Sequence, residues 1–400
     1  MTTPAADRPA LSIMVNESDM NGVIRSVDVE DHDRLIDRAR ITVQDAANVC
    51  TNFAERGQKV VISMGWGNQR TPIFEGYITH VRPLDSITTR PRRVVITALD
   101  PSYFMHLNRR VPRGFPGGDR PGKLSEIIRW IVTQPEYASR FQIDSAHLER
   151  HIIVEQDVEF SESNPLIQQN ETDLQFIYRL AHLYGARAFV ELNRQPGQDN
   201  AASQFYFISE RRLMSGDRLA TLRYCHGVSE ILEFSLNRVS SDAEPQRTAI
   251  AVDPSTGIAP EEIPAVQATE ETPTPDIAAQ VARIEAQQRS AAAIRERAEA
   301  MRSAPVQAQD LTRYYADTGL PSNPNLVQQV IRQDPTRILG LRGNGVAVGN
   351  ALLRAKSKIG ILGFSIWDDG DWYVHKVNHR ITIGEQESDQ SFRTSFEVSR

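Results

Sequence analysis

Alternation of apolar and polar residues over the first hundred positions constrains the fold more than any other feature of this chain. Four segments alternate or are rich in Val, Ile and Thr, and turn residues separate them: "RARITVQD", "KVVISMGW", "IFEGYITHV" and "RRVVITALD". Successive side chains of a strand point to opposite faces, so this pattern suits sheets with one buried face. We therefore predict a small antiparallel barrel-like β domain over residues 1–110.

Helical spacing begins after the Pro/Gly-rich stretch "RRVPRGFPGGD". In "KLSEIIRWIVTQ" the apolar residues Leu124, Ile127, Ile128 and Ile131 fall on one face of a helix. The chain then returns to strands with "ARAFVEL" and "QFYFISE". We assign residues 111–200 to a helical α/β segment.

A second helix is predicted within "NETDLQFIYRLAHLYGARAFVE". Thr172 can cap its start together with Gln175, and Gly185 stands at its end. Asp173 is placed favourably at the positive end of the helix, whereas Arg179 and His182 fall on the wetter side. One face carries the apolar stripe Leu174, Ile177, Leu180, Ala181 and Tyr184.

Strand patterns return in "LATLRYCHGVSEILEFSLNRVSS" and again near the C-terminus in "WYVHKVNHRITI" and "SFRTSFEVS". Residues 201–245 and 338–400 are therefore predicted to complete one second barrel-like β domain. Between them, residues 246–337 form a Pro- and Ala-rich insertion whose first part lacks apolar periodicity. The predicted fold class is β-dominated α+β, with two antiparallel β domains and an intervening helical segment.

Good helix formers fill residues 276–303 of the insertion, which predicts one long, mostly exposed helix. Its apolar stripe is imperfect, as in a helix that meets a partner or packs on its own subunit. The candidate interface residues on this stripe are Ile277, Val281, Ile284, Ile294 and Met301.

Composition excludes several classes of protein. A net charge of −6 argues against a surface dedicated to duplex phosphate, so no sequence-specific nucleic acid is expected. Cys50 and Cys225 fit no metal or redox spacing. Neither a leader-like segment nor a run of about 18 apolar residues occurs, so we expect synthesis in the cytoplasm and no membrane insertion.

No motif predicts a metal or cofactor. In an extended strand His375 and His379 lie roughly 13 Å apart, too far to share one ion. His147 and His151 have no evident third ligand. "DDGDW" is interpreted as a tight turn, and "GLRGNGVAVG" lacks the lysine and βαβ context of a phosphate loop.

Catalytic signatures are equally weak. No nucleophile elbow and no Ser-His-Asp sequence signature occurs. The acidic pair Glu159 and Glu162 leaves open a peptidoglycan hydrolase. Acidic pairs arise by chance in a chain with 51 acidic residues, so we predict that the protein is not an enzyme.

Three stretches resemble one known family. "LIQQNETDLQFIYRLAHLYGARAFV" is similar to a segment of the baseplate hub family of contractile tails, which includes phage late control gene D proteins, the hub region of VgrG proteins, and the hubs of extracellular contractile injection systems. The barrel-like stretch from "GQKVVISMGW" to "SYFMHL" resembles the family's first barrel, in which an Asp follows the last strand. The ending "GDWYVHKVNHRITI" to "FEVSR" resembles its closing strands.

This resemblance implies a structural homotrimer with two barrels per subunit, forming a pseudo-sixfold ring between a sixfold tail tube and a threefold spike. The implied partners are a tube or tube-initiator protein, a separate spike protein and baseplate wedge proteins. Because no OB-fold or β-helical repeat follows Arg400, we expect the spike to be a separate chain. The insertion has no counterpart in the family pattern, which leaves open an adaptor that recruits cargo through its helix.

Overall fold

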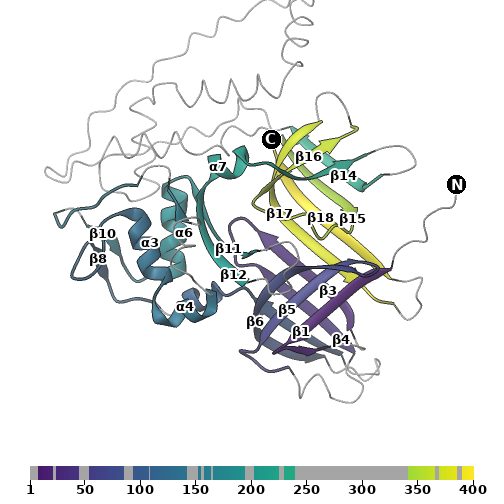
Figure 1. Cartoon of the computed structure of the whole chain (residues 1–400), viewed down its shortest axis with the longest axis horizontal. Helices are drawn as coiled ribbons and strands as arrows, with labels where there is room; N and C mark the ends of the chain where they lie inside the picture. The colour runs from purple at the N-terminus through teal and green to yellow at the C-terminus, as the bar shows by residue number, and fades with distance from the viewer. Residues whose placement is uncertain are drawn as a thin grey trace, which may run out of the picture.

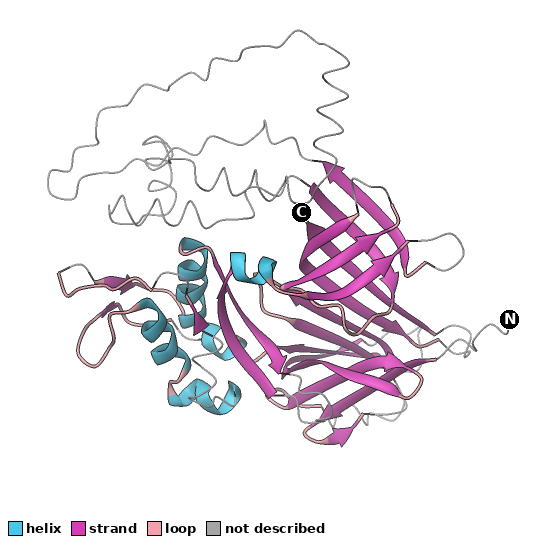
Figure 2. Ribbon diagram, turned by 45° about the horizontal axis from the view of Figure 1, so that its top comes forward, coloured by secondary structure: helices cyan, strands magenta, loops and turns pink. Residues whose placement is uncertain are grey.

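The structure is a computed structural model of the whole chain. It describes residues 8–20, 24–44, 54–84, 93–107, 109–141, 152–154, 157–163, 165–193, 202–224, 229–238, 341–364, 369–384 and 390–400. Strands dominate it, and helices are few (Figures 1 and 2). No helix within these ranges is long and apolar enough to cross a membrane.

The N-terminal β region follows the alternation predicted from the sequence. Its strands are β1 (Pro9–Val15), β2 (Ser18–Asp19), β3 (Ile24–His32), β4 (Arg38–Gln44), β5 (Lys59–Trp66), β6 (Gln69–Leu84) and β7 (Arg93–Leu99). In β4, buried Ala39, Ile41 and Val43 alternate with more accessible neighbours. The buried sides of these strands enclose one core, which includes Val27, Ile41, Ile62 and Ile96.

The middle of the chain contains the helices. Its elements are α2 (Tyr103–His106), β8 (Arg113–Phe115), α3 (Leu124–Val132), α4 (Pro135–Phe141), β9 (Ile152–Ile153), β10 (Leu166–Gln168), α6 (Asp173–Leu183), β11 (Ala186–Asn193), β12 (Ala202–Ser209) and α7 (Glu210–Ser215). Figure 1 shows α3, α4 and α6 gathered at one side of the molecule.

Helix α6 begins and ends as its sequence predicts. The Thr172 hydroxyl accepts a hydrogen bond from the Gln175 backbone, and the Gln175 side chain accepts one from the Thr172 backbone, which completes a capping box. Gly185 follows the helix with φ +58°, a conformation that costs glycine little. The predicted stripe, from Leu174 to Tyr184, is buried.

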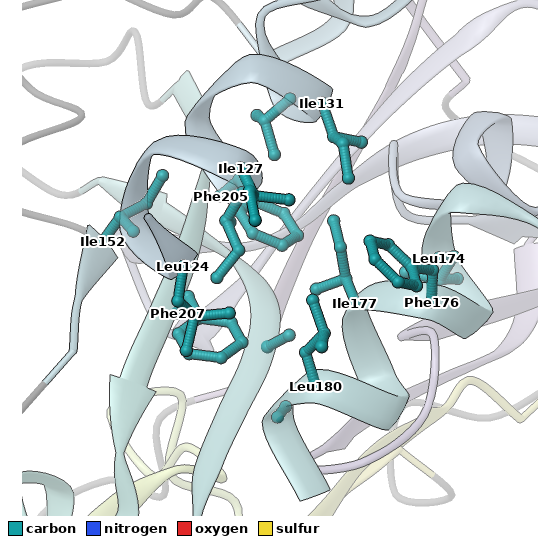
Figure 3. Close-up of a cluster of buried hydrophobic side chains, with 14 of the residues drawn as sticks. Leu124, Ile127, Ile131, Ile152, Leu174, Phe176, Ile177, Leu180, Phe205 and Phe207 are labelled. Atoms are coloured by element: carbon teal, nitrogen blue, oxygen red, sulfur yellow. The ribbon is translucent and has the colours of Figure 1, made fainter. Parts of the chain in front are cut away.

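A second core joins α3 and α6 to the small sheet of β11, β12 and β9. Figure 3 shows Leu124, Ile127 and Ile131 of α3 facing the same interior as Ile177 and Leu180 of α6. Phe205 and Phe207 of β12 complete this core. Strand β11 contributes Ala186, Ala188 and Val190 to the core. The side chains that alternate with these three, Arg187, Phe189 and Glu191, face away from it.

The C-terminal β region contains β13 (Arg218–Arg223), β14 (Ile231–Arg238), β15 (Leu341–Val348), β16 (Ser357–Leu362), β17 (Gly370–Thr382) and β18 (Ser391–Ser399). Trp372, Val377 and Phe396 are buried in its own core. Figure 2 shows that these strands and those of the N-terminal region curl as two groups.

Strand β17 connects the two β regions into one sheet. One of its edges pairs with β18. Its other edge is divided, because residues 370–374 pair with β16 and residues 376–382 pair with β3. The sheet therefore runs in the order β14-β15-β18-β17-β3-β4-β7-β6-β5-β1-β2.

The β-dominated α+β class is confirmed, but three details differ from the prediction. The described strands of the N-terminal and C-terminal β regions form one shared sheet rather than two closed barrels. The β13–β16 pair is parallel, although an antiparallel domain was expected. Strand β12, which was assigned to the second β domain, pairs with β11 and β9 instead. The division into four domains as a whole stays a prediction.

Candidate functional site

The residues with the strongest chemical character form a buried ionic junction where β3, β4, β7, β11 and the connection at residues 349–356 meet. We use this name for Asp31, Asp37, Asp100, Glu191, Arg354 and Lys356. Lys356 is only 6% exposed, and its Nζ lies 2.5 Å from Asp31 Oδ1 and 3.0 Å from Asp37 Oδ2. Both carboxylates belong to the N-terminal β region, so one buried lysine ties the C-terminal connection to it.

Arg354 extends the junction to β11. Its Nε lies 2.8 Å from Asp31 Oδ2, and its Nη2 pairs with Glu191. The Nη1 group donates to the Ile73 carbonyl oxygen at 2.5 Å. One guanidinium therefore contacts β3, β6 and β11 together, which fixes the three parts of the chain against one another.

Asp37 and Asp100 also organise the turn before β4. Asp100 Oδ2 accepts from the Asp37 backbone at 2.6 Å, and Asp100 Oδ1 accepts from the Ser102 backbone at 2.7 Å. Asp37 Oδ1 accepts from the His32 backbone at 2.8 Å. Asp100 is the Asp that follows the last strand of the N-terminal region, a feature of the family resemblance. In the structure its carboxylate holds the backbone of the turn before β4 and the backbone of Ser102.

Burial and unequal pairing divide the carboxyl groups of the junction. Burial opposes ionisation of Asp31, but Lys356 and Arg354 outweigh it and hold the pKa of Asp31 well below its usual range. Burial, reinforced by Asp31 and Asp100, raises the pKa of Asp37 well above its usual range despite Lys356. Burial also raises the pKa of Asp100. Asp31 therefore ionises more readily beside Lys356 than Asp37 does.

The junction gives opposite pH dependences to two conservative variants. Asp31 has a depressed folded-state pKa, so its contribution to stability is present above the unfolded pKa of about 4 and is lost as pH falls below that value. We expect Asp31→Asn to lower the urea midpoint at pH 7, and the deficit to shrink as pH falls below about 4.

Asp37 has a raised folded-state pKa, so wild-type stability falls as pH rises through that pKa. The deficit of Asp37→Asn should therefore shrink as pH rises, and parallel slopes for the two variants would contradict this assignment.

A second set of side chains surrounds β17 at a bulge. His375 Nδ1 donates to Asp33 Oδ2 at 3.0 Å, and His375 Nε2 lies 2.5 Å from Ser399 Oγ. Arg187 Nε donates to the same Asp33 oxygen at 3.3 Å. The pairing register of β17 and β18 shifts between Val374 and Lys376, which places His375 in the bulge.

The order of Asp33, His375 and Ser399 is that of a catalytic triad, and sequence reasoning did not find it. Its environment favours a structural role. Ser399 is 3% exposed and is the last residue of β18, paired with neighbouring strands on both sides, so its hydroxyl is not presented to a substrate. Asp33 also pairs with Arg187. Burial raises the pKa of Asp33, but the hydrogen bond from His375 and the charge of Arg187 outweigh burial and hold this pKa below its usual range. The three residues connect β3, β17 and β18.

Asp173 has a larger role than the helix-end position predicted for it. It is fully buried and accepts from Arg113 Nη2 at 2.5 Å and from Arg110 Nε at 2.8 Å. The Tyr137 hydroxyl and the Gln168 amide also donate to it, at 2.8 and 3.0 Å. This carboxylate therefore joins the start of α6 to α4 and to the β8–β10 pair.

The motifs set aside in the sequence have ordinary structural roles in the described residues. His379 is buried, with its ring nitrogens against Thr394 Oγ1 and the Leu353 carbonyl. Asp369 accepts from the Gly363 and Phe364 backbones, as in a tight turn. Glycines of "GLRGNGVAVG" allow aromatic packing rather than phosphate binding, since a Cβ at Gly349 would meet the Phe392 ring at 2.1 Å.

Several candidate residues lie outside the described residues. They include the predicted interface stripe Ile277, Val281, Ile284, Ile294 and Met301, together with Cys50, Cys225, His147 and His151. The chain leaves β14 at Arg238 and returns to β15 at Leu341, and these two residues pair with each other. Glu159 and Glu162 are both exposed. Within the described ranges, no group of three or more His, Cys, Asp or Glu side chains is arranged to hold a metal ion.

Solved structures similar to this chain are tail and secretion proteins. A tail protein from Neisseria meningitidis MC58 matches with a TM-score of 0.56 and 9% identity, over 98% of this chain and 96% of that chain. The E. coli c3393 protein matches with a TM-score of 0.52 and 11% identity, over 96% of this chain and 76% of that chain. That protein is a component of the type VI secretion system and exhibits structural similarity to the phage T4 tail proteins gp27 and gp5.

A third similar structure is the 43 kDa tail protein of prophage MuSo2 from Shewanella oneidensis, with a TM-score of 0.50 and 11% identity over 98% of each chain. No protein-family model matches the sequence, and no curated protein matches it. At such low identity the likeness concerns the fold.

Proposed function

We propose that this chain, which has the fold of bacterial and prophage tail proteins and of a type VI secretion component, is the structural baseplate hub of a contractile phage tail or injection system. The observation that carries the proposal is the match to a tail protein over nearly the full length of both chains. In this role the chain forms a homotrimer that joins a sixfold tail tube to a separate threefold spike. It is assembled in the cytoplasm and is then part of the baseplate.

The two β regions provide a physical reason for a symmetry adaptor. Each curls around its own core, and β17 holds both in one sheet. Three copies would present six β units to a sixfold tube, while the whole chains keep the threefold symmetry of a spike. The buried ionic junction supports this role, because it fixes the two β regions against β11 and so limits their relative motion.

The place of the protein in a particle tests the proposal. Antibody fragments against the chain should label purified particles at the spike end of the tail, next to the end of the tube. Labelling along the sheath, or particles that contain no copy of the chain, would contradict a hub. As a control, an antibody against the tube protein should label tail tubes from which the sheath has been removed along their whole length.

A peptidoglycan hydrolase is the enzymatic alternative, and its two candidate sites can be tested together. We expect the purified protein to give no clearing on a zymogram at high loading, because Ser399 is buried and Glu159 lies on an open surface. Clearing that disappears in Glu159→Gln would support the acidic pair. Clearing that disappears in Ser399→Ala, with an unchanged urea midpoint, would show that the Asp33–His375–Ser399 arrangement is catalytic.

The insertion is the basis of a third proposal, an adaptor arm. Its attachment at the paired ends of β14 and β15 means that its removal leaves both strands intact. Deleting residues 276–303, which include Ile277 and Met301, tests it. If spike-bearing particles assemble but lack cargo or wedge components, the predicted helix recruits them. If those particles are complete, the predicted helix does not recruit a partner.

A further inference from the structure

The outward side of the large sheet has a cationic character that the net charge of −6 conceals. Six exposed arginines lie on β15, β18, β17, β4 and β7, and we call them the arginine face: Arg342, Arg393, Arg380, Arg38, Arg40 and Arg93. They alternate along their strands with buried residues, so they share the side that faces away from the two cores.

Strand register places part of this face in one row. Arg393 pairs with Arg380, Arg380 with Asp28, and Asp28 with Arg40. Neighbouring strands lie about 4.8 Å apart, so this row spans roughly 14 Å across four strands and both β regions. The row exists only because β17 joins the two regions.

Ion pairs occupy only some of these arginines. Arg380 Nε lies 2.5 Å from Asp28, and Arg38 Nη2 lies 2.6 Å from Glu30. Across the ranges that the structure describes, no carboxylate pairs with Arg40 or Arg393, which are both exposed. Two guanidinium groups at the ends of the row are therefore available for carboxylates of another molecule.

The same side of the sheet is hollowed beside the row. A concavity of about 500 Å³ lies over β14, β15, β18 and β17. Its outward lining includes Lys376, Asn378, Ser395 and Glu397 on the strands of the row, and Glu233 on β14. A convex polar element of a partner can enter this hollow while its flank covers the arginines.

We propose that the arginine face and the adjoining hollow bind an acidic protein surface. A protein partner fits better than nucleic acid, because acids lie among the arginines and in the hollow and would repel a uniform row of phosphates: Asp28, Glu30, Glu233 and Glu397. A folded partner can place carboxylates over Arg40 and Arg393 and neutral or basic groups over the acids. Arginine is also enriched in protein interfaces. The proposal does not depend on the hub role.

A charge-reversal pair tests this proposal on the full chain. The probe is a fluorescein-labelled peptide of about 20 glutamates, and binding is measured by anisotropy at low and moderate salt. We expect the Arg40→Glu, Arg393→Glu double variant to bind at least about tenfold more weakly than wild type, since two charge-assisted contacts are lost. The matched control is Arg56→Glu, Arg70→Glu, two exposed arginines near β5 and β6, which should leave binding unchanged.

Three results would overturn the proposal. One is no binding of the peptide, or equal losses in both double variants. Another is tighter binding of a 20-base-pair DNA duplex than of the peptide, which would assign the face to nucleic acid. The third is concentration-dependent self-association that only the Arg40 and Arg393 variant loses, which would assign it to a second copy. If that variant unfolds by circular dichroism, the glutamine pair Arg40→Gln, Arg393→Gln replaces it in each measurement.

Discussion

Replacing Lys356 with methionine is expected to lower the free energy of unfolding by about 3–5 kcal/mol. Methionine keeps most of the side-chain volume but removes the ammonium that lies 2.5 Å from Asp31 and 3.0 Å from Asp37, so Arg354 is left as the one buried cation beside Asp31 among the described residues. Removing one partner of a buried ion pair is costly because the other charge stays out of water. Urea unfolding at pH 7 measures the effect.

Lys376→Met is the matched control for this experiment. Lys376 belongs to the neighbouring strand β17 and pairs with Glu30 at 3.4 Å, but both side chains are 29% exposed. Exposed pairs of this kind are worth about 0–1 kcal/mol, so the control should lie close to wild type. Equal losses in the two variants would show that the junction contributes no more to stability than a surface ion pair does.

Replacing Asp173 with asparagine is expected to lower the free energy of unfolding by about 2–3 kcal/mol. The sequence alone predicts only a favourable charge at the start of a helix for this residue. The change removes the charge that Arg110 and Arg113 share while keeping the size of the side chain. The two arginines are 23% and 16% exposed, so water can partly replace the carboxylate. The predicted readout is a lower urea midpoint at pH 7.

The control for Asp173 stands two residues earlier. Glu171 pairs with Arg179 at 2.6 Å, and these side chains are 18% and 34% exposed. Glu171→Gln should therefore cost less than about 1 kcal/mol. If Glu171→Gln proves as damaging as Asp173→Asn, the buried network around Asp173 has no special weight and the helix-end interpretation from sequence would be sufficient.

Local features of the fold could be predicted from the sequence because their causes are local. Alternation in "RARITVQD" follows from the pleat of β4, and Thr172 forms a capping box with Gln175, three positions later. The apolar stripe of α6 likewise follows from helical spacing. These features depend on neighbours within a few positions along the chain.

The pairing of β17 could not be predicted in the same way. Its alternation indicates which side chains are buried but not which strand lies at each edge. Only the three-dimensional structure shows that residues 376–382 pair with β3, more than three hundred positions earlier. The prediction of two separate barrels therefore missed the shared sheet.

The candidate sites depend on distant residues as well. Asp31, Glu191 and Lys356 meet from three separate parts of the chain, and no spacing motif connects them. The same holds for Asp33, His375 and Ser399. Composition does not show that Lys356 is buried. The one sequence feature that pointed to the ionic junction was Asp100, the acid that follows the last N-terminal strand in the family resemblance.

The mass of the chain in complex with its tube and spike proteins tests the central proposal most directly. Light scattering of the co-expressed, purified complex should give three copies of the chain per trimeric spike, with the tube protein bound at the opposite end. Assembly with a partner can be needed for the trimer to form, so the chain is measured in the complex rather than alone. A stable monomer that binds neither protein would contradict the hub.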